Sequence, residues 1–165
     1  MKGPAGRHPI RRTARVLVID ESDRVLLLRT QLPHRKEDSV WLTPGGGLKP
    51  GETHEEAAIR ELREETGLTG VDLGPWVWRR QAVWRWGDRT YEARERFFLL
   101  RVPRFVVSPT VAVDLEAETV LEHRWWSVRQ LQAASGESFA PSRIGEHLAV
   151  IVEGCLPDTP IDVGY

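Results

Sequence analysis

The sequence predicts a mixed-sheet sandwich of strands and helices, of the α/β or the α+β class. Two short runs rich in leucine and branched residues, residues 14–20 and 24–30, are typical of buried strands. Residues 76–86 and 89–102 flank a Gly-Asp turn signal and predict a long β-hairpin. A helical segment, residues 53–67, lies between these strands, so the two kinds of element are mixed along the chain.

Composition excludes several classes of protein. The 165 residues suit one domain with one core, and 41% apolar and 28% charged residues exclude a disordered chain. A formal net charge of −1 gives no electrostatic reason to expect polymeric nucleic acid or a membrane surface as a partner. The single cysteine, Cys155, excludes an internal disulfide framework and fits a reducing compartment. Because we also expect neither a signal peptide nor a membrane span, the predicted location is cytoplasmic.

The first elements follow from local patterns. Residues 1–12 are predicted to form a flexible arm, and residues 13–165 a single domain. The strands at residues 14–20 and 24–30 are separated by a turn-like Glu-Ser-Asp and are expected to pair. Residues 31–41 are mostly polar and predict a loop.

The central helix has clear start and stop signals. Thr53 and Glu56 have the spacing of a capping box, so the helix begins at Thr53. Gly67 is the expected stop. Beyond it, the patterns predict a short strand at residues 71–73, the hairpin, a strand at 122–127, and helices at 128–134 and 143–154.

Three carboxylates of this helix share one side. At 100° per residue, Glu61, Glu64 and Glu65 fall within an arc of about 100°. Ala58, Ile59 and Leu62 are expected to cover the adjoining arc and face a core. Clustered carboxylates suit a hard divalent cation, which binds several oxygen ligands. The alternative is a solvated acidic face, balanced by neighbouring arginines.

The segment around this helix matches a known signature. Gly46, Glu52 and the run RELREETGL at residues 60–68 occupy every fixed position of G-x5-E-x7-R-E-u-x-E-E-x-G-u, where u is aliphatic. The chain therefore resembles the Nudix hydrolases (MutT-like). The resemblance implies an α/β/α sandwich with a mixed β-sheet. It also implies hydrolysis of a nucleoside diphosphate linked to another moiety, with Mg²⁺ or Mn²⁺.

The same resemblance assigns roles to individual residues. Glu61, Glu64 and Glu65 become metal ligands, joined by the backbone carbonyl of Gly45, with Glu52 supporting the metal site. Arg60 orients the catalytic glutamates. The general base that takes the proton from water is a glutamate of the helix, such as Glu61 or Glu64, or an acid of a later loop. In that loop, Asp114, Glu116, Glu118 and Glu122 are the candidates, and Glu118 is preferred.

Substrate contacts are predicted outside the signature. Arg29 ends a strand where several relatives place a phosphate-binding arginine, and His34 lies in a loop that can cover the substrate. Trp84 and Trp86 alternate along the hairpin and can stack on a nucleobase. The alternatives for these residues are surface positions and, for the tryptophans, packing in the core or in a homodimer interface. Of Trp125 and Trp126, one is expected in the core.

The expected partner is a small nucleotide. Markers after the signature that accompany ADP-ribose, dinucleoside polyphosphate or NADH substrates are missing, which leaves a nucleoside triphosphate or another nucleotide-linked compound. Two further hypotheses remain open. One is a non-catalytic Nudix-like module that binds a nucleotide or sugar and regulates a partner. The other is an acidic helix without a metal in an unrelated α+β protein.

Overall fold

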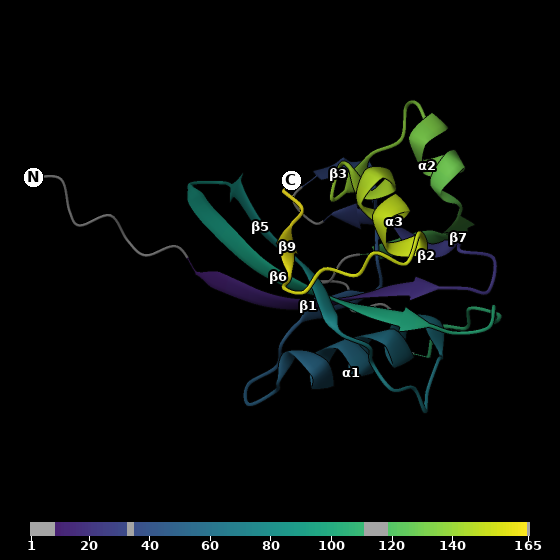
Figure 1. The fold of residues 1–165 in the computed structure, drawn as a ribbon. Helices are drawn as coiled ribbons and strands as arrows, with labels where there is room; N and C mark the ends of the chain where they lie inside the picture. The colour runs from purple at the N-terminus through teal and green to yellow at the C-terminus, as the bar shows by residue number, and fades with distance from the viewer. Residues whose placement is uncertain (1–8, 33–34, 111–118, 165) are drawn as a thin grey trace, which may run out of the picture.

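A computed structural model describes residues 9–32, 35–110 and 119–164, which build one curled, mixed β-sheet with helices on both faces (Figure 1). Its strands are β1 (Ile10–Ile19), β2 (Val25–Leu32), β3 (Arg35–Leu42), β4 (Gly45–Gly47), β5 (Trp76–Trp86), β6 (Arg89–Arg101), β7 (Thr119–Trp126), β8 (Phe139–Ala140) and β9 (Ile161–Asp162). Its helices are α1 (His54–Thr66), α2 (Val128–Ala133) and α3 (Ile144–Val152).

Strand β1 lies at the centre of the sheet. It pairs in parallel with β6 along its whole length, from Ile10 opposite Glu92 to Ile19 opposite Arg101. On its other edge it pairs antiparallel with β4 and, at its end, with β2. The second half of β1 is buried on both faces, as expected for a central strand that is covered above and below.

Two cores lie on opposite faces of the sheet. Helix α1 packs Ala57, Ala58 and Leu62 against Val16 and Val18 of β1. Helix α3 covers the other face, where the core includes residues from four strands and the helix itself: Leu17, Trp41, Trp78, Trp126 and Leu148. Figure 1 shows α1 on one side of the sheet and α2 and α3 on the other, which confirms the predicted sandwich.

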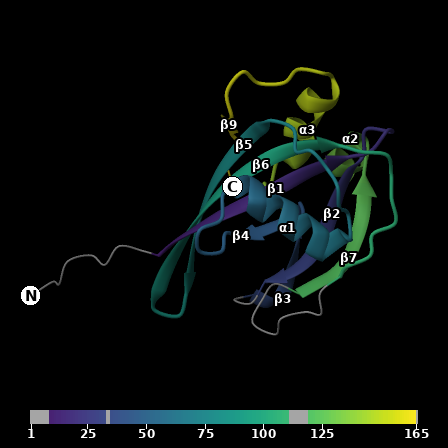
Figure 2. The ribbon, with the colours of Figure 1, turned by 90° about the horizontal axis from the view of Figure 1, so that it is seen from below.

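The hairpin of β5 and β6 extends beyond the rest of the sheet together with the start of β1 (Figures 1 and 2). Its strands flank Gly87, whose φ of 60° supplies the left-handed turn conformation. The predicted hairpin and both later helices are confirmed, and the strand predicted at residues 122–127 is observed as β7, which begins earlier, at Thr119. Trp126 is buried and Trp125 is half-buried, also as expected.

The predicted loop at residues 31–41 is wrong, because Arg35–Leu42 forms β3. The strand pairs antiparallel with β2, with Trp41 opposite Arg29, and in parallel with β8. Trp41 is 1% exposed and anchors the strand in the core. The pairing of a sheet strand with two neighbours therefore outweighs its polar local composition.

Three smaller expectations also need correction. Strand β1 begins at Ile10, inside the predicted arm, because β6 provides backbone partners there. Residues 71–73 form no strand, although Val71 and Leu73 pack against the core beneath α1. Ile59 is 41% exposed, because the buried face of α1 is centred closer to the glutamates than the apolar pattern indicates.

Candidate active site

Helix α1 is held at both of its ends. Thr53 Oγ1 accepts the N–H of Glu56 at 3.1 Å, and the Glu56 carboxylate accepts the N–H of Thr53 at 2.9 Å, so the predicted capping box is present. Gly67 ends the helix with a φ of 77°. Beyond it, the backbone N–H of Ser108 donates to the carbonyl of Thr66. These contacts hold α1 in place and thereby set the direction in which its glutamate side chains project.

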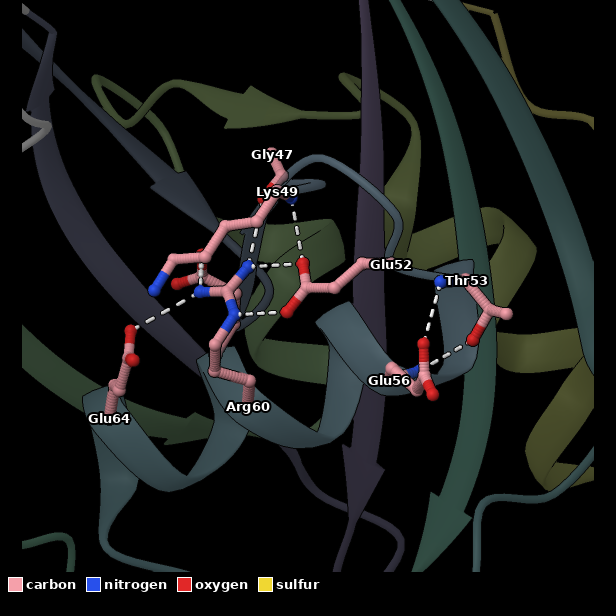
Figure 3. Close-up of polar contacts among 8 residues, drawn as sticks. Gly47, Lys49, Glu52, Thr53, Glu56, Arg60 and Glu64 are labelled. Carbon is pink, nitrogen blue, oxygen red and sulfur yellow. Dashed lines mark hydrogen bonds and ion pairs between the residues drawn. The ribbon is translucent and has the colours of Figure 1, made fainter.

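Arg60 gathers the carboxylates at one side of α1 (Figure 3). Its Nε and Nη2 donate to the two carboxylate oxygens of Glu52 at 2.6 and 2.9 Å. Its Nη1 donates to Glu61 at 2.7 Å and lies 3.4 Å from Glu64. Its Nη2 also donates to the carbonyl of Gly47 at 3.0 Å. One guanidinium therefore ties the loop before the helix to the helix itself.

The same contacts control protonation. The Arg60 hydrogen bonds, with a smaller contribution from the backbone N–H of Lys49, lower the pKa of Glu52 to about 2. In turn, the hydrogen bonds to Glu52 raise the pKa of Arg60 above its ordinary value. Glu52 is therefore a fixed anion that holds Arg60 in place at any pH near neutrality.

The glycine strand β4 lies directly against two of the glutamates. The N–H of Gly45 donates to Glu65 Oε2 at 2.8 Å. A Cβ atom on Gly46 would lie 2.6 Å from Glu61 Oε1, so the Glu61 carboxylate occupies the space that a larger residue would need. Gly45 has a φ of +148°, and a Cβ there would lie 2.2 Å from the Ala14 carbonyl oxygen.

The donor set fits a divalent cation in its chemistry. Glu61 and Glu65 have carboxylate oxygens against β4, Glu64 carries a third carboxylate on the same helix, and the Gly45 carbonyl oxygen belongs to β4. Hard cations such as Mg²⁺ prefer oxygen ligands of this kind. In the described part of the chain, no three acidic, histidine or cysteine side chains converge on a common point. Glu61 and Glu64 turn toward Arg60 instead, and Glu65 turns toward Gly45. To bind one shared ion, these long side chains would have to rotate toward a common point.

Of the predicted substrate contacts, Arg29 and Trp84 have described side chains, and both contact residues of neighbouring strands. Arg29 is half exposed on β2, where its Nε donates to Ser39 Oγ at 2.8 Å and its Nη1 lies 3.7 Å from Glu122. Trp84 stacks on Tyr91 across the hairpin, with ring centroids 5.7 Å apart. His34, Glu118 and the side chain of Trp86 lie outside the described residues, as do Asp114 and Glu116. These roles therefore stay predictions.

Sequence patterns missed a buried ion cluster next to β4. Arg15 Nε donates to Glu95 Oε1 at 3.1 Å, and Arg80 Nη1 donates to Glu95 Oε2 at 2.5 Å. Burial would raise the pKa of Glu95, but the charges of Arg15 and Arg80 outweigh it and hold that pKa below its ordinary value. The sequence does contain a signal for this cluster. In each of two apolar strand segments, a charged residue occupies a position that alternation assigns to the core: Arg15 in ARVLVI and Glu95 in ERFFLL.

No helix in the described ranges has the length and apolar character needed to cross a membrane.

Known proteins are similar to this chain in sequence and in fold. A putative 8-oxo-dGTP diphosphatase of Bacillus subtilis (strain 168) is 48% identical over 56 residues, which are 34% of this chain and 34% of the relative. An RNA pyrophosphohydrolase of Erythrobacter litoralis (strain HTCC2594) is 36% identical over 112 residues, which are 61% of this chain and 65% of the relative. The matched segments thus span about a third and about two thirds of these relatives.

The structural and family comparisons agree. The MutT protein of Methanosarcina mazei Go1 superposes with a TM-score of 0.64 at 21% identity, over 90% of this chain and 96% of that one. At this identity the similarity supports the fold alone. The family model described as the NUDIX domain matches residues 9–144, which include β1, the glycine strand and all of α1. Because that match covers most of the chain, the protein belongs to the Nudix family.

Proposed function

We propose that this chain is a divalent-metal-dependent pyrophosphohydrolase of the cytoplasm. Its substrate is a nucleoside diphosphate linked to another moiety, and the bond cleaved lies within the diphosphate. The observation that carries the proposal is the arrangement of three glutamates of α1: Glu61 and Glu64 contact Arg60, and Glu65 accepts from the Gly45 N–H of β4. Such a cluster repels an anionic substrate unless a cation is present.

Each residue of the cluster has a specific task in this mechanism. Glu61, Glu64 and Glu65, with the carbonyl oxygen of Gly45, would hold Mg²⁺ or Mn²⁺. The bound ion would neutralise phosphate charge, polarise a phosphoryl oxygen and make the attacking water more acidic. Glu52 would support the cluster by anchoring Arg60, since both of its oxygens accept from that guanidinium.

A carboxylate oxygen completes the reaction by accepting a proton. Water attacks phosphorus, the phosphorus–oxygen bond of the anhydride breaks, and the water proton passes to a glutamate oxygen. Glu61 and Glu64 of the cluster are the candidate bases on α1, and Glu118 is the proposed candidate from the later loop. Phosphate oxygens would be bound by Arg29, and His34, Trp84 and Trp86 would contact the rest of the nucleotide.

The names of two relatives support one substrate class. One relative is named for 8-oxo-dGTP, which is a nucleoside triphosphate, and another is named an RNA pyrophosphohydrolase. A nucleoside triphosphate, normal or oxidised, is therefore the proposed substrate class. An RNA with a 5′-triphosphate is the competitor that the relatives introduce.

A hydrolysis screen tests this proposal. The purified chain is incubated with Mg²⁺ or Mn²⁺ and with normal and oxidised nucleoside triphosphates, nucleotide sugars, ADP-ribose, dinucleoside polyphosphates and 5′-triphosphate RNA. Release of pyrophosphate, phosphate or a nucleoside monophosphate that EDTA abolishes supports the proposal. Calorimetric nucleotide binding without turnover of any compound would instead support the regulatory binding module.

We expect Gly46→Ala to lower hydrolysis without unfolding the protein. The new Cβ would meet the flexible end of Glu61, which can rotate away, rather than fixed backbone. Displacing this carboxylate by about 1 Å should reduce kcat on the order of 100-fold. The measurement is the steady-state rate beside the thermal unfolding midpoint. A variant with the wild-type rate would show that the position of Glu61 in the structure does not matter for turnover.

A further inference from the structure

Two arginines share one glutamate inside the sheet. Arg15 on β1 and Glu95 on β6 are 6% and 5% exposed, and Arg80 reaches Glu95 from β5. The three residues come from three neighbouring strands and face the same side of the sheet, away from α1. They form a cluster with one positive charge in excess.

The stability of the fold alone does not explain why these charged residues are buried. Removing charges from water costs several kcal/mol per ion, and a buried ion pair rarely exceeds the stabilisation that apolar side chains of similar size would provide. The remaining polar atoms of the cluster are also imperfectly paired, since Arg80 Nε is buried without a hydrogen-bond partner among the described residues. The contacts that Arg15 makes beyond Glu95 indicate what the cluster does.

Arg15 holds the backbone that leads into the candidate metal site. Its Nη1 donates to the carbonyl oxygens of Thr43 and Gly45, at 3.2 and 3.1 Å. These carbonyls lie on either side of Pro44, so a single guanidinium group fixes the turn into β4. The close approach depends on glycine, because a Cβ at Gly45 would lie 2.7 Å from Arg15 Cα and 2.9 Å from Arg15 Cδ.

The Gly45 backbone connects this turn to helix α1. Its carbonyl accepts from Arg15 on one side, while its N–H donates to Glu65 at 2.8 Å on the other. A carbonyl oxygen has two lone pairs, so the contact with Arg15 leaves room for another ligand. The orientation of this backbone therefore depends on Arg15, and the orientation of Arg15 depends on Glu95.

We propose that Arg15, held by Glu95, is a positioning residue for the metal site, which it shapes by fixing the Gly45 carbonyl and, through the Gly45 N–H, the Glu65 carboxylate. This inference rests on the proposed metal-dependent function. It adds to that function two supporting residues on β1 and β6, outside the sequence signature. Among the described residues, Arg80 contacts Glu95 and has no hydrogen bond to the Gly45 turn.

Arg15→Lys tests the inference, with Arg80→Lys as its matched control. Lysine keeps the charge beside Glu95 but lacks the planar fork that reaches the Thr43 and Gly45 carbonyls together with Glu95. We expect Arg15→Lys to weaken Mn²⁺ binding, measured by titration calorimetry or by the spin resonance of free Mn²⁺, about tenfold or more. At saturating Mn²⁺, the KM for nucleotide should stay within about twofold.

Arg80→Lys should keep the Mn²⁺ affinity of the wild type, whatever it does to the unfolding midpoint. Glu95→Gln provides a second route to the same outcome, because it frees Arg15 from its ionic partner at nearly constant volume. If Arg15→Lys and Glu95→Gln bind Mn²⁺ as tightly as the wild type, or if Arg80→Lys weakens binding equally, the inference is overturned. If the wild-type chain binds no Mn²⁺, the proposed metal-dependent function fails as well, so the two failures are distinguishable.

Discussion

Glu64→Gln is expected to lower the rate of hydrolysis at least about 100-fold while leaving stability nearly unchanged. Glutamine keeps the shape of the side chain but removes the negative charge that a cation or a transferred proton requires. Among the described residues, the Glu64 side chain makes one polar contact, 3.4 Å from Arg60, the longest that this arginine makes with a carboxylate. Its contribution to folding is therefore small, so a loss of rate reports on chemistry.

The matched control for this variant is Glu55→Gln on the same helix. Glu55 is exposed in the first turn of α1, more than one turn before Glu61. The Glu55→Gln variant loses the same negative charge as Glu64→Gln, and its rate of hydrolysis is expected to stay near that of the wild type. Steady-state kinetics and chemical unfolding of both variants distinguish a loss of catalysis from a loss of stability. Equal rates for Glu64→Gln and the wild type would remove Glu64 from the mechanism.

Arg60→Ala is expected to impair both folding and turnover. The change leaves Glu52, Glu61 and Glu64 without their shared cation, so the carboxylates repel one another. Arg60 is only 13% exposed, but part of its contacts is screened by solvent, so we expect a loss of about 1–2 kcal/mol in the free energy of unfolding. Adding Mg²⁺ should restore more stability to this variant than to the wild type, because a cation then relieves the repulsion.

Arg63→Ala is the control for this prediction. Arg63 is exposed on the next turn of α1, and its removal should change stability by a few tenths of a kcal/mol, with no particular response to Mg²⁺. Urea unfolding of the wild type and of both variants, each with and without Mg²⁺, measures all six combinations. An Arg60→Ala variant that is no less stable than Arg63→Ala would show that Arg60 does not organise the cluster.

Local signals in the sequence are sufficient for helix α1 and for the hairpin. Thr53, Glu56 and Gly67 act over three or four residues, and the structure contains each of their expected contacts. Such signals work because caps and turns are completed by groups that are close in the chain. Strand β3 carries no such signal, since its partners are strands β2 and β8 and its anchor is the buried Trp41.

In the candidate site, too, some features were predictable from the sequence and others were not. The signature predicted Arg60 and the glutamates of α1. In the structure Arg60 contacts Glu61 and Glu64, and the Gly45 N–H of β4 donates to Glu65. Periodicity alone placed Ile59 toward the core, whereas α1 turns its glutamate side closer to the sheet. The direction in which a helix docks depends on the shape of the sheet beneath it, which no window of sequence contains.

By itself the sequence determined the family, the capped helix, its cluster of glutamates and the glycines that lie beside them. All of these depend on residue type and on short spacings, which are properties of the chain before it folds. Only the tertiary structure decided that Arg15 and Glu95, 80 residues apart, would meet inside the sheet and hold the turn at Gly45. Contacts at that separation arise when β1 and β6 pair in parallel, so they depend on the register of the sheet rather than on any local pattern.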